Sequence, residues 1–171
     1  ADAASPGSST DSTGSGACIV SMTAARTVNA EFRPVRDLTV VKAGSGAGTV
    51  TSAPVGVNCG TDCVESCDVN TAVVLTAVAA AGSRFVGWSG GGCTGTGTCA
   101  LTVTAAASVT ATFTVNTYTL TVTKTGTGTG TVTSSPAGIT CGADCTETLD
   151  HGEMITLTAT SGGGWPKSAT A

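Results

Sequence analysis

The chain has little charge and a single histidine, and these shortages exclude several classes of function. Charged residues make up 11% of its 171 residues, and the seven lysines and arginines are scattered through a chain of net charge −4. Binding to nucleic-acid phosphates requires a basic patch or stripe, which this sequence lacks. We therefore expect no nucleic-acid partner, and a surface kept soluble mainly by hydroxyl groups and small side chains.

Long apolar runs are also missing. No stretch approaches the roughly 20 apolar residues that cross a bilayer as a helix, so we expect no membrane span. The longest small-apolar run, 72–81, is interrupted by Thr76 and is interpreted as a strand. The N-terminal sequence ADAASPGSSTDSTGSG has neither the basic start nor the apolar centre of a signal peptide. Either a signal has been removed or the chain is a piece of a longer protein, and shortened repeats favour the second.

The chain does contain an internal repeat. The stretch 118–145, YTLTVTKTGTGTGTVTSSPAGITCGADC, resembles the earlier stretch 38–63, LTVVKAGSGAGTVTSAPVGVNCGTDC. Lys42 aligns with Lys124, and one constant offset of 82 positions relates the two stretches without a gap from that match to the last cysteine. A period near 80 residues indicates a tandem array of small units.

The repeat divides the chain into four segments. We predict a flexible lead-in at residues 1–17, because a chain of Ser, Thr, Gly and Ala cannot bury enough apolar surface to become ordered. Residues 18–34 are predicted to be the C-terminal remnant of a first repeat, and residues 36–117 a complete second repeat. Residues 118–171 are predicted to be a shortened third repeat that lacks the closing strands and holds its first strands loosely.

Alternation of apolar and polar residues with a period of two predicts a mostly β fold of tandem small modules. Residues 18–32 contain two such alternating runs, and the same pattern returns 81 positions later in residues 99–113. We expect two half-buried strands in each of these segments and about six short strands in the complete unit. Its core is expected to include Phe85, Trp88, Leu101, Val109 and Phe113.

Glycine-rich segments favour a β-hairpin at the start of each long unit. Leu38 and Val40 begin a strand, the turn AGSGAG follows, residues 49–52 return, and Pro54 ends the ladder because it has no N–H to donate. The matching hairpin of the third repeat is expected to present one face of threonine hydroxyls. This face either binds glycans or ordered water, or serves only as a solvated strand surface. Its members are Thr119, Thr121, Thr123, Thr129, Thr131 and Thr133.

Six of the eight cysteines form close pairs that predict local disulfides. Each pair lies in a turn rich in Gly, Asp or Thr, where chain reversal brings Cα atoms within disulfide reach. Closing a loop of about five residues gains roughly 2 kcal/mol in the chain-entropy model. Disulfides also place the chain in an oxidising compartment outside the cytosol. The predicted pairs are Cys59 with Cys63, Cys93 with Cys99, and Cys141 with Cys145.

The remaining cysteines leave zinc binding and free thiols as alternatives. Cys67 continues a spacing of four residues that a zinc site can use, but the matching residue of the third repeat is Leu149. An apolar residue there marks a buried core position, so we expect no metal and no cofactor. Ser12 stands where a partner of Cys18 is expected, so Cys18 and Cys67 are free, buried or paired with each other.

Several short motifs together resemble one known family. They are LTVTKTGTGTGTVTSSPAGITCGADCTETL, ITLTAT, GWSGGGCTGTGTCALTV and VTATF, which look like the divergent InlB B-repeat family of bacterial secreted and surface-attached proteins. The resemblance covers residues 18–160 or so, and the third repeat departs from it after Thr160. It implies small β-rich, partly β-grasp-like modules with spacer, stalk or adhesion roles and no catalysis.

Two catalytic or nucleotide-binding motifs occur but lack their structural context. Residues 87–91, with Ser89 at the centre, match G-x-S-x-G, yet a nucleophile elbow needs a following helix and a delivered histidine. The sole histidine, His151, belongs to another unit. Gly90, with the glycines at 92 and 95, matches a dinucleotide fingerprint, but no helix follows to hold a phosphate. We predict glycine-rich loops and no enzyme activity.

Pairs of carboxylates beside two of the cysteine loops suggest weak calcium binding as an alternative to a solvated acidic rim. Asp62 and Glu65 flank the first loop, and Asp144 and Glu147 flank its copy. Calcium takes six to eight oxygen ligands, so two carboxylates with nearby carbonyl groups supply too few ligands for tight binding.

These observations predict a non-catalytic, extracellular bacterial repeat segment that acts as a spacer or stalk. The expected partners are neighbouring repeats or domains of the same polypeptide. The alternative is an adhesin-type binding module that recognises glycans or proteins of a cell surface. A binding assay on residues 36–117 alone separates the two hypotheses.

Overall fold

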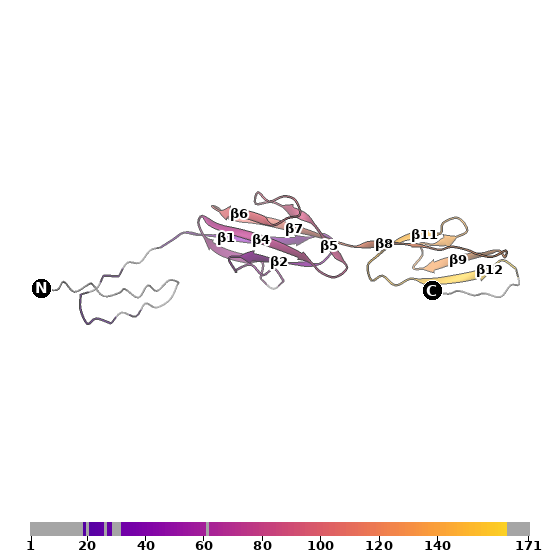
Figure 1. The fold of residues 1–171 in the computed structure, drawn as a ribbon, viewed down its shortest axis with the longest axis horizontal. Helices are drawn as coiled ribbons and strands as arrows, with labels where there is room; N and C mark the ends of the chain where they lie inside the picture. The colour runs from indigo at the N-terminus through magenta and orange to yellow at the C-terminus, as the bar shows by residue number, and fades with distance from the viewer. Residues whose placement is uncertain (1–18, 20, 26, 29–31, 61, 164–171) are drawn as a thin grey trace. The chain divides into compact units, whose positions relative to one another are not determined.

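The computed structural model describes residues 19, 21–25, 27–28, 32–60 and 62–163. These residues form twelve strands and no helix (Figure 1), so the predicted mostly β fold is confirmed. No helix in this part of the chain is available to cross a membrane. The chain divides into two compact units, Ala1–Phe32 and Arg33–Ala171, which are described separately below.

Seven strands between residues 35 and 115 make up what we call the central module. They are β1 (Val35–Ala43), β2 (Gly48–Ala53), β3 (Val64–Asp68), β4 (Thr71–Ala79), β5 (Ser83–Ser89), β6 (Cys99–Val103) and β7 (Ala107–Val115). Two of these, β3 and β5, were not predicted as strands from the sequence. The sequence thus located five of the seven strands, whereas about six were expected for the whole unit.

The seven strands form two sheets that enclose one core. One sheet has the order β3-β1-β7-β5 and the other the order β2-β4-β6. All neighbours are antiparallel except β1 and β7, which run parallel, with Val40 opposite Val109. The first and last strands of the module are therefore direct neighbours in one sheet.

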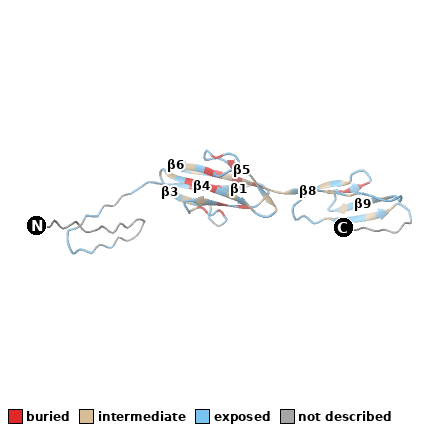
Figure 2. Cartoon of the chain, viewed as in Figure 1, coloured by how far each residue is buried: buried red, intermediate tan, exposed pale blue. Residues whose placement is uncertain are grey.

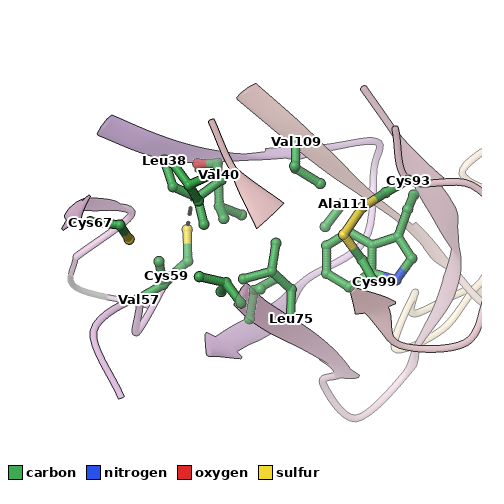
Figure 3. Packing of buried hydrophobic residues seen from close by; sticks show 14 of the residues in the cluster. Leu38, Val40, Val57, Cys59, Cys67, Leu75, Cys93, Cys99, Val109 and Ala111 are labelled. Carbon is green, nitrogen blue, oxygen red and sulfur yellow. Dashed lines mark hydrogen bonds between the residues drawn. A yellow bond between two sulfur atoms is a disulfide. The ribbon is translucent and has the colours of Figure 1, made fainter. Parts of the chain in front are cut away.

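The core of the central module lies between these two sheets (Figure 3). Alternate residues of β1 and β7 point inward, so Leu38 and Phe113 are almost completely buried. Val50 and Leu75, from the opposite sheet, are fully buried as well. Burying one such side chain contributes about 1.5–3 kcal/mol, which makes this cluster the main source of the module's stability.

The prediction of a β-hairpin at the start of the second and third repeats is wrong. Strands β1 and β2 do not pair with each other, because they belong to different sheets. Both strands carry apolar residues on one face, Leu38 on β1 and Val50 on β2, and those faces meet only when the strands lie on opposite sides of a core. The glycine-rich turn thus carries the chain from one sheet to the other.

Residues 117–163 form a second set of strands, which we call the C-terminal module. Its strands are β8 (Thr117–Thr121), β9 (Gly130–Ser135), β10 (Thr140–Cys141), β11 (Thr146–Asp150) and β12 (Thr156–Ser161). β8 pairs with β11, and β9 pairs with β10 and β12. These pairings correspond to those of β1 with β3 and of β2 with β4, at the offset of 82 residues.

The predicted threonine face is not continuous, because β8 and β9 lie in separate sheets. Thr119 and Thr121 are on β8, whereas Thr131 and Thr133 are on β9, and all four are exposed. Thr123 and Thr129, also exposed, lie outside the strands. The hydroxyl groups therefore cover two separate surfaces.

The C-terminal module buries far fewer residues than the central one (Figure 2). Ile139 and Cys141 are buried, but Leu157 is 42% exposed although its counterpart Leu75 is fully buried. Within residues 117–163 the structure contains no counterparts of β5, β6 and β7. The sheets therefore lack the strands that cover the core in the central module.

The first unit contains apolar side chains that are exposed. The described residues of the segment 19–32 do not form strands, so the two strands predicted in 18–32 do not appear there; the other positions of that segment lie outside the described residues. Phe32 is 93% exposed and Met22 70% exposed. The predicted lead-in, 1–17, also lies outside the described residues.

Candidate functional site

The first disulfide closes the loop between β2 and β3. Cys59 and Cys63 are bonded, with their Cα atoms 4.3 Å apart. The sulfur of Cys59 is fully buried and lies 3.8 Å from the carbonyl oxygen of Val40 (dashed in Figure 3), a packing contact because a disulfide sulfur has no proton to donate. The Cys59 N–H also donates to the carbonyl oxygen of Val50 over 2.7 Å. The loop is thus fixed to both sheets.

The same loop recurs in the C-terminal module. Cys141 and Cys145 are bonded with a Cα separation of 4.3 Å, and the Cys141 sulfur lies 3.7 Å from the Val122 carbonyl oxygen. Ser52 and Ser134 are also placed alike, since each hydroxyl donates to the carbonyl oxygen of the proline two residues later over 2.7 Å. The offset seen in the sequence therefore reproduces local geometry.

The carboxylates beside these loops hold the backbone. Asp62 accepts a hydrogen bond from the Val64 N–H, and Asp144 accepts one from the Thr146 N–H, each over 3.1 Å. Among the residues that the structure describes, no cluster of three or more His, Cys, Asp and Glu side chains is arranged to hold a metal ion. The two aspartates therefore stabilise the turn by accepting hydrogen bonds from its backbone.

The third disulfide closes the loop that follows β5. Cys93 and Cys99 are bonded with a Cα separation of 5.5 Å. Inside the loop, the carbonyl oxygen of Gly97 accepts a 2.7 Å hydrogen bond from the indole N–H of Trp88. Trp88 is 5% exposed, and its ring makes an edge-to-face contact with the Phe85 ring, with the two ring centroids 5.0 Å apart. The residues predicted for the core are buried to different degrees. Val109 and Phe113 are buried, as Trp88 is, whereas Phe85 and Leu101 are half-buried at the margin of the core.

Cys67 is a free, buried thiol on β3. Burial raises the pKa of the Cys67 thiol above its ordinary value, and the nearby carboxylates of Glu65, Asp68 and Asp37 raise it further. A protonated, buried thiol is a poor nucleophile and a poor metal ligand. Cys18 lies outside the described residues.

The G-x-S-x-G motif does not form a nucleophile elbow. Ser89 ends strand β5, and the chain continues through glycines with positive φ into the Cys93 loop instead of a helix. His151 lies in the C-terminal module, where its ring is 6.1 Å from that of Tyr118. The second motif, at Gly90, falls in the same loop and likewise precedes no helix.

A cleft of about 310 Å³ opens at one end of the central module. Its apolar lining includes Leu38, Val57 and Cys67, and Glu65 and Asp68 add two carboxylates. Val55, also in the lining, is 98% exposed. The composition suits a small ligand with an apolar part and a hydrogen-bond donor or cation.

The structure therefore defines a disulfide-closed, all-β module. Residues 38–117 match the family model described as the Divergent InlB B-repeat domain, which confirms the resemblance inferred from the sequence over this segment and indicates a bacterial repeat module. No curated protein and no solved structure matches the chain. The disulfides are consistent with an extracellular location, and the β-grasp-like detail stays a prediction.

Proposed function

We propose that the chain is a non-catalytic, load-bearing spacer segment of an extracellular bacterial protein. The observation that carries this proposal is the parallel pairing of the first and last strands of the central module. Leu38–Ala43 of β1 lie beside Ala107–Thr112 of β7. The chain enters the module at Val35 and leaves it at Val115, at opposite ends of this pair.

Tension along the polypeptide would therefore act parallel to the two strands. All hydrogen bonds of a ladder loaded in this direction share the force, whereas a pair pulled apart from one end breaks one bond after another. The disulfides add to this resistance because the residues within each closed loop cannot extend. A spacer needs this combination of fixed length and resistance to extension.

A short connection to the next strands supports the same role. One residue, Asn116, separates β7 from β8. Its N–H donates to the carbonyl oxygen of Gly82, and its own carbonyl oxygen accepts from the His151 N–H, each over 2.8 Å. A single residue held by two backbone hydrogen bonds is a stiffer link than a flexible linker.

The second candidate function is an adhesin-type binding module, and the observation that favours it is the cleft beside Cys67. A glycan array and a cell-binding assay, performed on the whole chain and on residues 36–117, separate the two functions. A spacer gives no binding above background. Binding that is lost on Glu65→Gln substitution but retained on Glu147→Gln substitution in the matched position would support the adhesin and contradict the spacer.

A further inference from the structure

The cleft of the central module lies between the edges of its two sheets. β3 is an edge strand of the first sheet, and β2 is an edge strand of the second. Residues 65–68 of β3 all line the cleft, and residues between 52 and 57, at the end of β2 and in the loop that follows, line it from the other side. Consecutive residues of a strand alternate between its two faces, so a cleft lined by four in a row runs along the edge of the strand.

The edge of β3 on the cleft side presents unpaired backbone groups. At the end of the β1–β3 ladder, the Val40 N–H donates to the Cys63 carbonyl oxygen. Every second residue counted from Cys63 faces β1 in the same way, so the residues between them, including Ser66 and Asp68, direct their N–H and C=O groups to the other side. No strand pairs with that side of β3 in the described part of the chain. Such an edge can accept an added strand.

Glu65 places a carboxylate in the cleft without a charged partner. Its side chain is half-buried, and no residue in the described ranges forms an ion pair or a hydrogen bond with the carboxylate. Gly56 lies against it, since a Cβ atom added to Gly56 would be 2.6 Å from the carboxyl carbon of Glu65. The same contact recurs in the C-terminal module, where a Cβ atom on Gly138 would be 2.5 Å from a carboxylate oxygen of Glu147. The glycine therefore leaves room for the glutamate beside the loop.

The charge around the cleft is negative. Asp68 adds a second carboxylate to the lining, and Asp37 on the neighbouring strand accepts a 2.6 Å hydrogen bond from the Ser66 hydroxyl. Arg36 lies opposite Cys67 in the ladder, but its guanidinium donates to the carbonyl oxygen of its neighbour at position 35 and is not part of the lining. A ligand that enters this cleft is therefore favoured by a positive charge.

The interior of the cleft is apolar and small. Leu38, Val57 and Val73 line it and are buried. Figure 3 shows Val57 and Cys67 at the end of the core away from the Cys93–Cys99 bond. The volume of about 310 Å³ is at the lower limit for ligand pockets. A space of this kind accepts one long side chain with an apolar stem and a charged tip, as in lysine and arginine.

We propose that the cleft binds an extended segment of a basic polypeptide, which pairs with the free edge of β3 and inserts one lysine or arginine side chain between the two sheets. The backbone of the segment bonds Ser66 and Asp68. A residue opposite Glu65 shares its face of the sheet, so its cationic tip lies beside the Glu65 carboxylate. The inference rests on the second candidate function, the binding module, and names the chemistry of its partner.

The C-terminal module keeps the glutamate, as Glu147, but has less space beside it. Each of three apolar lining residues is replaced by a larger one at the offset of 82 positions: Leu149 for Cys67, Ile139 for Val57, and Ile155 for Val73. The proposed site is therefore specific to the central module. The repeat itself also shows that leucine is accommodated at the position of Cys67.

The test is titration of the oxidised chain with a synthetic peptide of about eight residues in which threonine and lysine alternate, which is long enough to cover one strand. We expect the peptide to bind, and the same peptide with glutamate for each lysine not to bind. Lysine amide should bind about tenfold or more weakly than the lysine peptide, because it cannot pair with the β3 edge.

Matched variants locate the binding. Glu65→Gln should weaken it by about tenfold or more, because the buried tip of the lysine loses its counter-charge. Cys67→Leu should weaken it as much by filling the cleft, whereas Cys67→Ala leaves the space open and should keep it. Glu147→Gln removes the same charge from the C-terminal module and should leave binding unchanged. Circular dichroism of each variant checks that it is folded.

Three results would overturn the inference: no binding of the lysine peptide, equal losses in Glu65→Gln and Glu147→Gln, or binding that Cys67→Leu leaves unchanged. The second would mean that the peptide is attracted to a negatively charged protein in general. Failure of the inference is distinguishable from failure of the binding module. Cell binding that depends on Glu65, in a chain that does not bind the lysine peptide, would support the module and contradict the proposed partner.

Discussion

The indole N–H of Trp88 donates a 2.7 Å hydrogen bond to the carbonyl oxygen of Gly97. This bond joins the end of β5 to a loop that the Cys93–Cys99 disulfide closes. The loop therefore has a covalent constraint and a side-chain anchor from the core, and each can be removed separately.

Replacing Trp88 tests the anchor. Trp88→Phe keeps an aromatic ring beside Phe85 but leaves the Gly97 carbonyl without its donor, so we expect a loss of about 1–2 kcal/mol in the free energy of unfolding. Urea unfolding followed by circular dichroism measures it. Tyr118→Phe, at a position 58% exposed, is the control and should change stability by less than about 0.5 kcal/mol.

Removing the third disulfide tests the covalent constraint. The double variant Cys93→Ala, Cys99→Ala should lose about 2 kcal/mol, the chain-entropy value for a loop of this size. The loss is measured by urea unfolding under oxidising conditions. Unchanged stability would show that the Trp88 hydrogen bond alone holds the loop.

A matched pair of glycine substitutions tests how close β7 lies to the glycine-rich turn. Gly46→Ala places a methyl group against the backbone of Thr114 and should cost about 1–3 kcal/mol. Gly128→Ala, measured in dilute protein, meets nothing within 4 Å and should change stability by no more than about 0.5 kcal/mol. Equal losses would contradict the placement of β7.

The Cys67 thiol predicts a fall in stability at alkaline pH. Because burial and nearby carboxylates raise its folded-state pKa, the folded chain retains a proton that the unfolded chain releases above roughly pH 8.5. Its contribution to stability is complete below that pH and decreases as the pH rises toward the folded-state value. Unfolding experiments from neutral to alkaline pH measure this slope, which should be smaller in Cys67→Val.

Much of the fold was predictable from local sequence. The disulfides followed from short spacings within turns, and the buried position of Cys67 followed from its match to Leu149. These features depend on neighbouring residues, so the chain itself specifies them. The resemblance to a repeat family rested on the same local motifs.

The strand β5 was missed because a bulge hides its alternation. Phe85 and Trp88 are three residues apart, which places them on opposite faces of a regular strand. Phe85 pairs with Phe113 and Trp88 with Ala111, so the extra residue between Phe85 and Gly87 turns both rings toward the core. Nothing in the spacing of apolar residues alone indicates such a bulge.

Long-range pairing could not be predicted either. β1 and β7 are separated by more than sixty residues, and their parallel pairing is decided by how the two sheets enclose the core. The false hairpin had the same origin, since a glycine-rich turn between two apolar strands is compatible with pairing in one sheet or with crossing between two. The proposed mechanical role depends on this part of the structure.

The most direct test of the spacer function is single-molecule extension of the oxidised central module with the force applied at Val35 and Val115. The account predicts one abrupt unfolding event that releases residues 35–115, less the two disulfide loops, at about 3.3–3.6 Å per residue. Pulling at Ser83 and Val115, which are paired at one end of the antiparallel β5 and β7, should require much less force. Gradual extension at low force from Val35 and Val115, or equal forces in the two directions, would contradict the account.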